Sequence, residues 1–103
     1  MQVFVALVSE GLIPDEPNLF VSEQRRDEWV REALEEQSHD TLAAMVYNAI
    51  ENHTIEEFPF DGDPDREPKG VLVPALMRAA KLGTVYDEDI EVRTWTTELD
   101  TRD

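Results

Sequence analysis

The segment of residues 2–8 is apolar at both odd and even positions, and this feature constrains the fold most strongly. Successive side chains of a β-strand point to opposite faces of the sheet, so such a strand carries apolar side chains on both faces. Strands of this kind occupy inner positions of a sheet. We therefore predict a strand over residues 2–8 that is central in its sheet.

A shorter extended segment follows after a loop. Residues 9–18 contain Gly11, Pro14 and Pro17 among acidic side chains, which is typical of a loop. Residues 19–21 are again apolar and extended in character. We expect the two extended segments to form an antiparallel pair joined by this long acidic loop.

Residues 22–37 follow the pattern of an amphipathic helix. The Ser22 hydroxyl can accept a free backbone N–H at the helix start, and Glu23 complements the positive end of the helix. Asp27 and Arg31 are spaced as an opposite-charge i,i+4 pair. The apolar face comprises Trp29, Val30, Ala33 and Leu34.

A second helix is predicted over residues 41–51, with Asp40 as its cap and with Asn52 and His53 at its end. Its amphipathic spacing comes from Leu42, Met45, Val46, Asn48, Ala49 and Ile50. Residues 54–60 are ambiguous. Residues 61–69 form an acidic, proline-rich loop, which we expect to be flexible.

A third helix is expected with Pro74 in its first turn, where a missing N–H does no harm, and with Gly83 as its stop. Its apolar face comprises Leu76, Met77 and Ala80. Residues 71–73 are instead compatible with a short strand that leads into this helix.

Residues 90–99 are rich in β-branched side chains and predict a last strand, with Ile90 and Val92 on one face and Trp95 on the other. A polar tail, residues 100–103, follows. The expected fold is α+β, a small, mainly antiparallel sheet of about three strands packed on one face by two or three helices. The predicted order is β-β-α-α-α-β.

The length of 103 residues predicts a single domain. The chain has no cysteine, which excludes disulfides and thiolate chemistry and makes an intracellular location the default. Residues 1–8 lack a basic region and a cleavage site, so they do not resemble a signal peptide. No apolar run is as long as a membrane span. We expect a cytoplasmic protein.

The charge is the feature that bears most on function. The chain has 24 acidic and 9 basic residues, and its formal net charge is −15. A surface of this sign repels nucleic acid and anionic membranes, so neither is expected as a direct partner. A basic protein surface, or a cation-rich solvent, is favoured.

The candidate interaction face is acidic and comes from three segments. It comprises Glu28, Glu32, Glu35 and Glu36 in the first helix, Glu56, Glu57, Asp61, Asp63 and Asp65 in the region after the second helix, and Asp87, Glu88 and Asp89 before the last strand.

Motifs for cation binding are incomplete. The alternating carboxylates of residues 61–67 begin like an EF-hand loop, but its sixth position is Arg66 and its twelfth is Leu72. His39 and His53, the only histidines, are too far apart for an i,i+4 metal pair. We expect a solvated loop and no metal site.

Catalytic motifs are missing from the sequence. There is no serine nucleophile elbow and no glycine-rich phosphate loop, and the 4 glycines are not clustered. With 24 carboxylates, close pairs arise by chance, whereas catalysis needs a desolvated cleft that separates their pKa values. We predict a protein that is not an enzyme and has no cofactor.

The two tryptophans are either core residues or interface anchors. Trp29 lies on the apolar face of its helix, which favours core packing. Trp95 lies opposite Ile90 and Val92, and both interpretations stay open for it.

Three hypotheses account for the acidity. The first is mimicry of nucleic acid: phage-encoded inhibitors of restriction and CRISPR systems resemble this chain in being short, cysteine-free, acidic and without catalytic motifs. The second is adaptation to high cytoplasmic salt, which the near absence of lysine also fits, since only Lys69 and Lys81 are present. The third is a small regulatory module that binds a basic protein. We adopt mimicry as the working hypothesis because it alone makes a functional claim.

Overall fold

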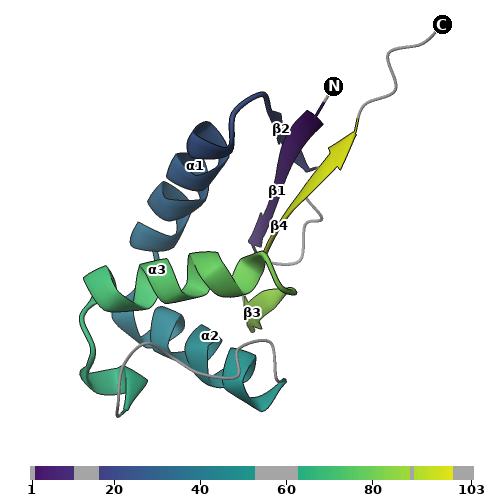
Figure 1. Ribbon diagram of the computed structural model, residues 1–103. Coiled ribbons are helices and arrows are strands. Elements are labelled where there is room, and N and C mark those ends of the chain that lie inside the picture. Colours follow the sequence, from purple (N-terminus) through teal and green to yellow (C-terminus); the bar gives the residue numbers. More distant parts are fainter. Residues whose placement is uncertain (1, 11–16, 53–62, 89, 99–103) are drawn as a thin grey trace, which may run out of the picture.

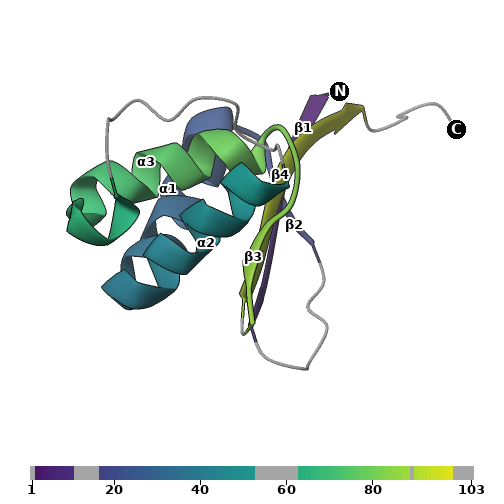
Figure 2. The same cartoon turned by 90° about the horizontal axis from the view of Figure 1, so that it is seen from below.

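The helices cover one face of a four-stranded antiparallel sheet (Figures 1 and 2). The computed structural model describes residues 2–10, 17–52, 63–88 and 90–98. In chain order the elements are β1 (Gln2–Glu10), β2 (Asn18–Phe20), α1 (Glu23–Glu35), α2 (His39–Glu51), the 3-10 helix η1 (Pro64–Arg66), α3 (Lys69–Ala80), β3 (Val85–Asp87) and β4 (Ile90–Glu98). The predicted α+β class and the one-sided helical layer are confirmed.

The strand order is β2-β1-β4-β3, so β1 is an inner strand as predicted. It pairs along its whole length with β4, from Gln2 opposite Glu98 to Glu10 opposite Ile90, and it pairs antiparallel with β2. Ala6 and Val8 contribute to the core under the helices, whereas Val3 and Val5 lie on the other face. Val3 and Val5 are also buried, which explains the apolar residues on both faces of this strand.

The core lies between the sheet and the helical layer. Each helix contributes from one face, because its apolar residues recur at intervals of three or four positions. Full burial of a large aliphatic side chain stabilises a fold by about 1.5–3 kcal/mol. Among the described residues, the large side chains fully buried in this core are Leu34 and Val30 from α1, Leu42, Met45 and Val46 from α2, Leu72 and Leu76 from α3, and Val85 and Val92 from the sheet.

Helix α1 begins as predicted but pairs its charges differently. The Ser22 hydroxyl accepts the Arg25 N–H at 3.3 Å. The expected ion pair between Asp27 and Arg31 is wrong, because Asp27 instead lies 3.1 Å from Arg26 and 3.4 Å from Lys81. A pair with a buried guanidinium is screened less than an exposed i,i+4 pair, which contributes only a few tenths of a kcal/mol.

Helix α2 is capped by Ser38, and the prediction of Asp40 as the cap is wrong. The Ser38 hydroxyl accepts the Thr41 N–H at 3.2 Å, so the helix begins at His39. Asp40 falls in the first turn, where its charge still complements the positive helix end. Asn52 ends the helix as expected.

Helix α3 begins at Lys69, so residues 71–73 are helical and not a strand. Pro74 therefore lies inside the helix, and its predicted place in the first turn is wrong. The earlier start buries Leu72 and Val73, while Pro74 and Gly70 are exposed. Water can therefore hydrogen-bond the Gly70 carbonyl that Pro74 leaves without a helical partner. At the other end, the Gly83 N–H donates to the Ala79 carbonyl at 3.1 Å.

The sheet has four strands where about three were expected, because β3 was not predicted. It is only 3 residues long and pairs with the start of β4, where Val85 lies opposite Val92 and is fully buried. Within the loop predicted over residues 61–69, η1 packs on α2 and buries Pro64. Residues 54–62 and the polar tail lie outside the described residues. In the described part of the chain, no helix has the length and apolar character needed to cross a membrane.

Candidate functional site: the acidic end of helix α1

The four glutamates predicted on α1 are all exposed and extend from the middle of the helix to its C-cap. Glu28, Glu32 and Glu35 belong to the helix, and Glu36 is its C-cap residue. The last turn contains no basic residue. Carboxylates near a helix C-terminus interact unfavourably with the negative end of the helix dipole. Glu35 and Glu36, which lie nearest this end, therefore do not stabilise α1 by their charge.

A second part of the predicted acidic face lies at one end of the sheet. Asp87 pairs with Ile90, which on its other side pairs with Glu10. Neighbouring strands lie about 4.8 Å apart, so the backbones of Glu10 and Asp87, on either side of β4, are separated by about 10 Å. Glu88 follows in the turn. Glu32 and Glu36 of α1 lie near the same end, because they line a hollow together with Glu10.

Asp63 and Asp65 do not join the α1 face and instead bind Tyr47 of α2. The Tyr47 hydroxyl donates to Asp63, and it lies 3.4 Å from Asp65. The hydrogen bond to Asp63 is the main reason why the pKa of Tyr47 is raised to about 12, and the same bond lowers the pKa of Asp63. Tyr47 lies about 12 Å along α2 from its start at His39. The other predicted members, Glu56, Glu57, Asp61 and Asp89, lie outside the described residues.

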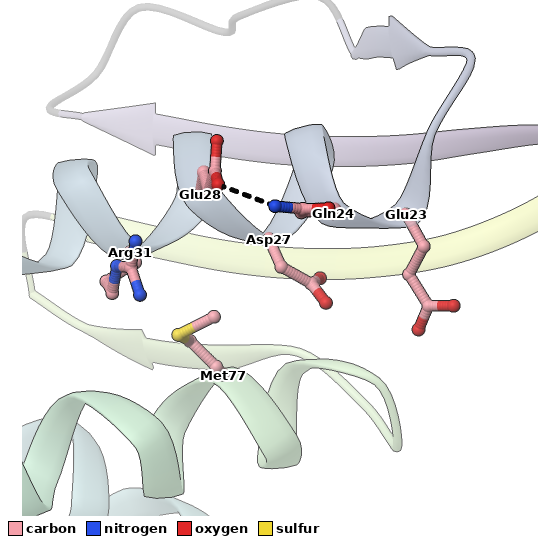
Figure 3. A pocket seen from close by; sticks show the side chains of 6 residues that line it. All are labelled: Glu23, Gln24, Asp27, Glu28, Arg31 and Met77. Carbon is pink, nitrogen blue, oxygen red and sulfur yellow. Dashed lines mark hydrogen bonds between the residues drawn. The ribbon is translucent and has the colours of Figure 1, made fainter.

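Two hollows flank α1, and they differ in how their charges are paired. The larger, of about 550 Å³, lies between α1 and α3. Figure 3 shows Met77 of α3 reaching toward α1, and Asp27 and Arg31 pointing toward α3. Its lining residues are Glu23, Gln24, Asp27, Glu28, Arg31 and Met77. We call it the α1–α3 hollow.

Two of the three acidic groups of the α1–α3 hollow are already matched by cations of the chain. Lys81, at the end of α3, lies 3.5 Å from Glu23 and 3.4 Å from Asp27. Arg26 lies 3.5 Å from Glu23 and 3.1 Å from Asp27. Glu28 accepts a hydrogen bond from Gln24 at 3.2 Å. The two ion pairs of Lys81 therefore link the end of α3 to α1 across this hollow.

Arg26 is buried, with 2% of its surface exposed, and sequence reasoning missed it. Its guanidinium lies 5.5 Å from the centre of the Phe4 ring and donates to the Trp95 carbonyl at 3.3 Å. A signal was present, because Arg26 precedes Val30 and Leu34 at intervals of four and so shares their face.

The smaller hollow, which we call the α1–β1 groove, has a volume of about 270 Å³. It is lined by Val8, Glu10, Trp29, Glu32, Ala33 and Glu36. The Trp29 ring packs on Phe20, with 5.7 Å between ring centres, and Gln37 donates a hydrogen bond to Glu10 at 3.1 Å. No cation from the described residues lies within ion-pairing distance of the three carboxylates. The groove thus combines buried and half-buried apolar residues with exposed carboxylates that have no ion pair to a described residue.

The tryptophans have different environments. Trp29 is half-buried and packs against the core, as favoured from the sequence, but it also lines the α1–β1 groove. Trp95 lies on the face of β4 opposite Ile90 and Val92, as predicted. The guanidinium of Arg93 lies 5.3 Å from the centre of the Trp95 ring.

The histidine and the carboxylates that the structure describes do not converge on a metal position. Within the described ranges, no group of three His, Cys, Asp or Glu side chains is arranged to hold a metal ion. His39 lies at the start of α2, and its Nε2 atom is 2.6 Å from the Glu67 carbonyl oxygen. It thereby connects α2 to the end of η1. His53 lies outside the described residues.

Comparison with known proteins gave no relative. No protein-family model matches the chain, and searches of the curated proteins and of the solved structures found no match.

Proposed function

We propose that this protein is a non-enzymatic, acidic binding protein that engages the basic surface of a nucleic-acid-binding protein and mimics nucleic acid there. On this proposal it is an inhibitor encoded by a phage or another mobile element, and its target is a component of a restriction or CRISPR system. The observation that carries the proposal is a set of exposed carboxylates at the end of α1, continuous with the α1–β1 groove and without an ion pair to any described residue: Glu32, Glu35 and Glu36.

The density of charge on α1 supports this proposal. From Glu28 to Glu36 the helix rises about 12 Å. Four carboxylates lie in this span, about one for every 3–4 Å, and Arg31 is the one basic residue among them. A single DNA strand carries one charge per about 3.4 Å of helix axis. Helix α1 thus presents a charge spacing that a DNA-binding surface can accept.

The position of these charges within the helix also supports a role in binding. Each carboxylate near the end of α1 opposes the helix dipole, which costs roughly 0.3–1 kcal/mol at an exposed site. A charge that is unfavourable for the fold and has no ion pair with a described residue is available to pair with a cation from outside. A basic partner supplies such a counter-charge.

A second candidate explanation is adaptation to high salt, in which the acidity maintains hydration and has no specific target. The exposed carboxylates beyond α1 favour it, because Asp40 and Glu51 lie on α2, and Glu91 and Glu98 lie on β4. A regulatory module with a basic protein partner is a third candidate, which shares the binding face and differs in the identity of the target.

Affinity capture from host lysate, followed by mass spectrometry, tests the proposal. We expect the protein to retain a nuclease or another nucleic-acid-binding protein, and we expect duplex DNA to displace it. The variant E32K/E35K/E36K should lose this capture. The variant E51K/E91K/E98K changes the net charge equally at exposed sites away from α1, and it should keep most of the capture.

Two results would reject the proposal. One is specific retention of only structural or metabolic proteins. The other is an equal loss of capture in both triple variants, because this would show that net charge alone, and not the α1 face, determines binding.

A further inference from the structure

The α1–β1 groove combines three chemical features in one small space. Val8 and Ala33 supply aliphatic surface, Trp29 supplies an aromatic ring, and Glu10, Glu32 and Glu36 supply negative charge. Pockets for drug-sized ligands are generally about 300–1,000 Å³. A volume of about 270 Å³ therefore suits a single side chain better than a larger molecule.

We propose that this groove receives an arginine side chain from the basic partner, an inference that rests on the proposed function and deepens it. An arginine has an apolar stem and a planar, permanently charged head. The stem would contact Val8 and Ala33, and the guanidinium would stack on Trp29 and donate hydrogen bonds to the carboxylates. Charge complementarity identifies the occupant, because the rim holds three negative charges and no described cation neutralises them.

The arrangement of the carboxylates favours arginine over a metal ion or lysine. The groove's three carboxylates are described residues and do not form a metal-ligand cluster, so they surround the hollow without meeting at one point. A planar guanidinium with five donors can reach separated acceptors, whereas a metal ion needs converging ones. Guanidinium is also more weakly hydrated than ammonium and stacks better on an aromatic ring.

The α1–α3 hollow shows the contrast within the same molecule. It has the larger volume and a similar number of acidic residues, but Arg26 and Lys81 already pair with two of them and Arg31 lines it. The α1–β1 groove lacks such internal partners among the described residues. In addition, the hydrogen bond from Gln37 holds Glu10 in place, so part of the rim is ordered before a ligand enters.

The test uses N-acetyl-arginine amide as the probe, titrated into isotope-labelled protein and followed by NMR at low salt. We expect saturable shifts at the Trp29 indole N–H and at the amides of Val8 and Ala33. N-acetyl-lysine amide should bind at least about threefold more weakly, because its ammonium group cannot stack on the Trp29 ring or form bidentate hydrogen bonds with a carboxylate.

Matched variants locate the site. E32Q and E36Q should each weaken arginine binding about three- to tenfold, the loss expected for one charge-assisted contact at a partly exposed site. E35Q makes the same charge change on the same helix outside the groove, so it should change binding less than about twofold. Far-UV circular dichroism checks that each variant is folded.

The inference is overturned if E35Q weakens arginine binding as much as E32Q does. It is also overturned if the chemical-shift changes caused by N-acetyl-arginine amide do not centre on residues of the groove. The two proposals fail separately. If the protein captures a nucleic-acid-binding protein but arginine does not bind in the groove, the proposed arginine site is rejected and the proposed function stands. If arginine binds in the groove but the lysate yields no such partner, the proposed arginine site stands and the proposed function is rejected.

Discussion

Removing charge from the end of α1 should stabilise the fold even though it weakens binding. The perturbation is the double variant E32Q/E36Q. Both side chains are exposed, Glu36 caps the helix, and Glu32 lies one turn before it. Neither has an ion pair with a described residue. Glutamine keeps the size and removes the charge, so the change isolates electrostatics.

The magnitude follows from two contributions. Glu36 opposes the helix dipole at about 0.3–1 kcal/mol, and Glu32 lies further from the terminus and contributes less. Mutual repulsion of the i,i+4 pair adds roughly 0.2–0.5 kcal/mol. The double variant should therefore gain about 0.5–1.5 kcal/mol. For a domain of this size, 1 kcal/mol corresponds to a Tm change of about 4–8 °C.

Urea unfolding followed by circular dichroism at low salt measures this gain. The midpoint should rise while the slope with denaturant stays unchanged. The gain should shrink in about 1 M KCl, where the Debye length falls to about 3 Å. E23Q is the control, because Glu23 lies in the first turn, where a negative charge is favourable, and it pairs with Arg26. E23Q should lower the stability.

Two outcomes would refute this reasoning. If E32Q/E36Q destabilises the protein at low salt, these carboxylates support the fold, and their unpaired state no longer argues for an external partner. If E23Q and E32Q/E36Q shift the stability in the same direction and by the same amount per charge, only the net charge matters and the position in the helix does not.

Three further predictions concern the scaffold that holds the site. R26M should lower the free energy of unfolding by about 1–2 kcal/mol in urea melts, because it removes the buried charge-assisted bonds but keeps the volume of the side chain. R26A should lower it by about 2 kcal/mol more, because it also removes the packing of the arginine stem. Equal losses in the two variants would contradict this. In an absorbance titration, the tyrosine step near pH 12 should move toward 10.0 in D63N. The hydrogen bond between Tyr47 and Asp63 should stop stabilising the fold as the pH rises through the raised pKa of Tyr47. It should also stop doing so as the pH falls through the lowered pKa of Asp63. An unchanged tyrosine titration in D63N would rule out the bond. S38A should lower the free energy of unfolding by about 1 kcal/mol and D40N by only a few tenths, because Ser38 and not Asp40 caps α2. If thermal melts show the larger loss in D40N, Ser38 is not the cap.

Elements with a strong local signal could be predicted from the sequence. Helix α1 shows clear helical periodicity, β1 is a continuous apolar run and β4 is rich in β-branched residues. Ser22 provides both the chemistry and the position of a cap. In these segments local preference and tertiary packing favour the same structure. The inner position of β1 also followed, because a strand that is apolar at successive positions is typical of the interior of a sheet.

The errors arise where tertiary contacts outweigh the local signal. Strand β3 is too short for periodicity and forms because Val85 packs under the helices opposite Val92. Helix α3 starts before Pro74 because the burial of Leu72 and Val73 favours extra helical turns. For β3 the packing helix α2 is distant in the chain, although Val92 is only seven residues away. In both cases the packing that decides the structure cannot be recognised from the segment alone.

The candidate site was recognisable in part. The acidic face of α1 follows from helical spacing, and all four of its glutamates are exposed. Glu10 was missed, because only the sheet register and the packing of α1 place it beside Glu32 and Glu36. Asp63 and Asp65 were included but bind Tyr47, a contact between η1 and α2 that the sequence does not indicate.

The measurement that tests the central claim most directly is far-UV circular dichroism as a function of KCl concentration. The claim is that the carboxylates of α1 serve a partner and that the fold does not need concentrated salt. We expect the native helical signal to persist below about 0.1 M KCl, where the Debye length exceeds roughly 10 Å and repulsion is strongly felt. Unfolding in that range, with recovery as KCl is added, would contradict the claim and assign the acidity to adaptation to salt.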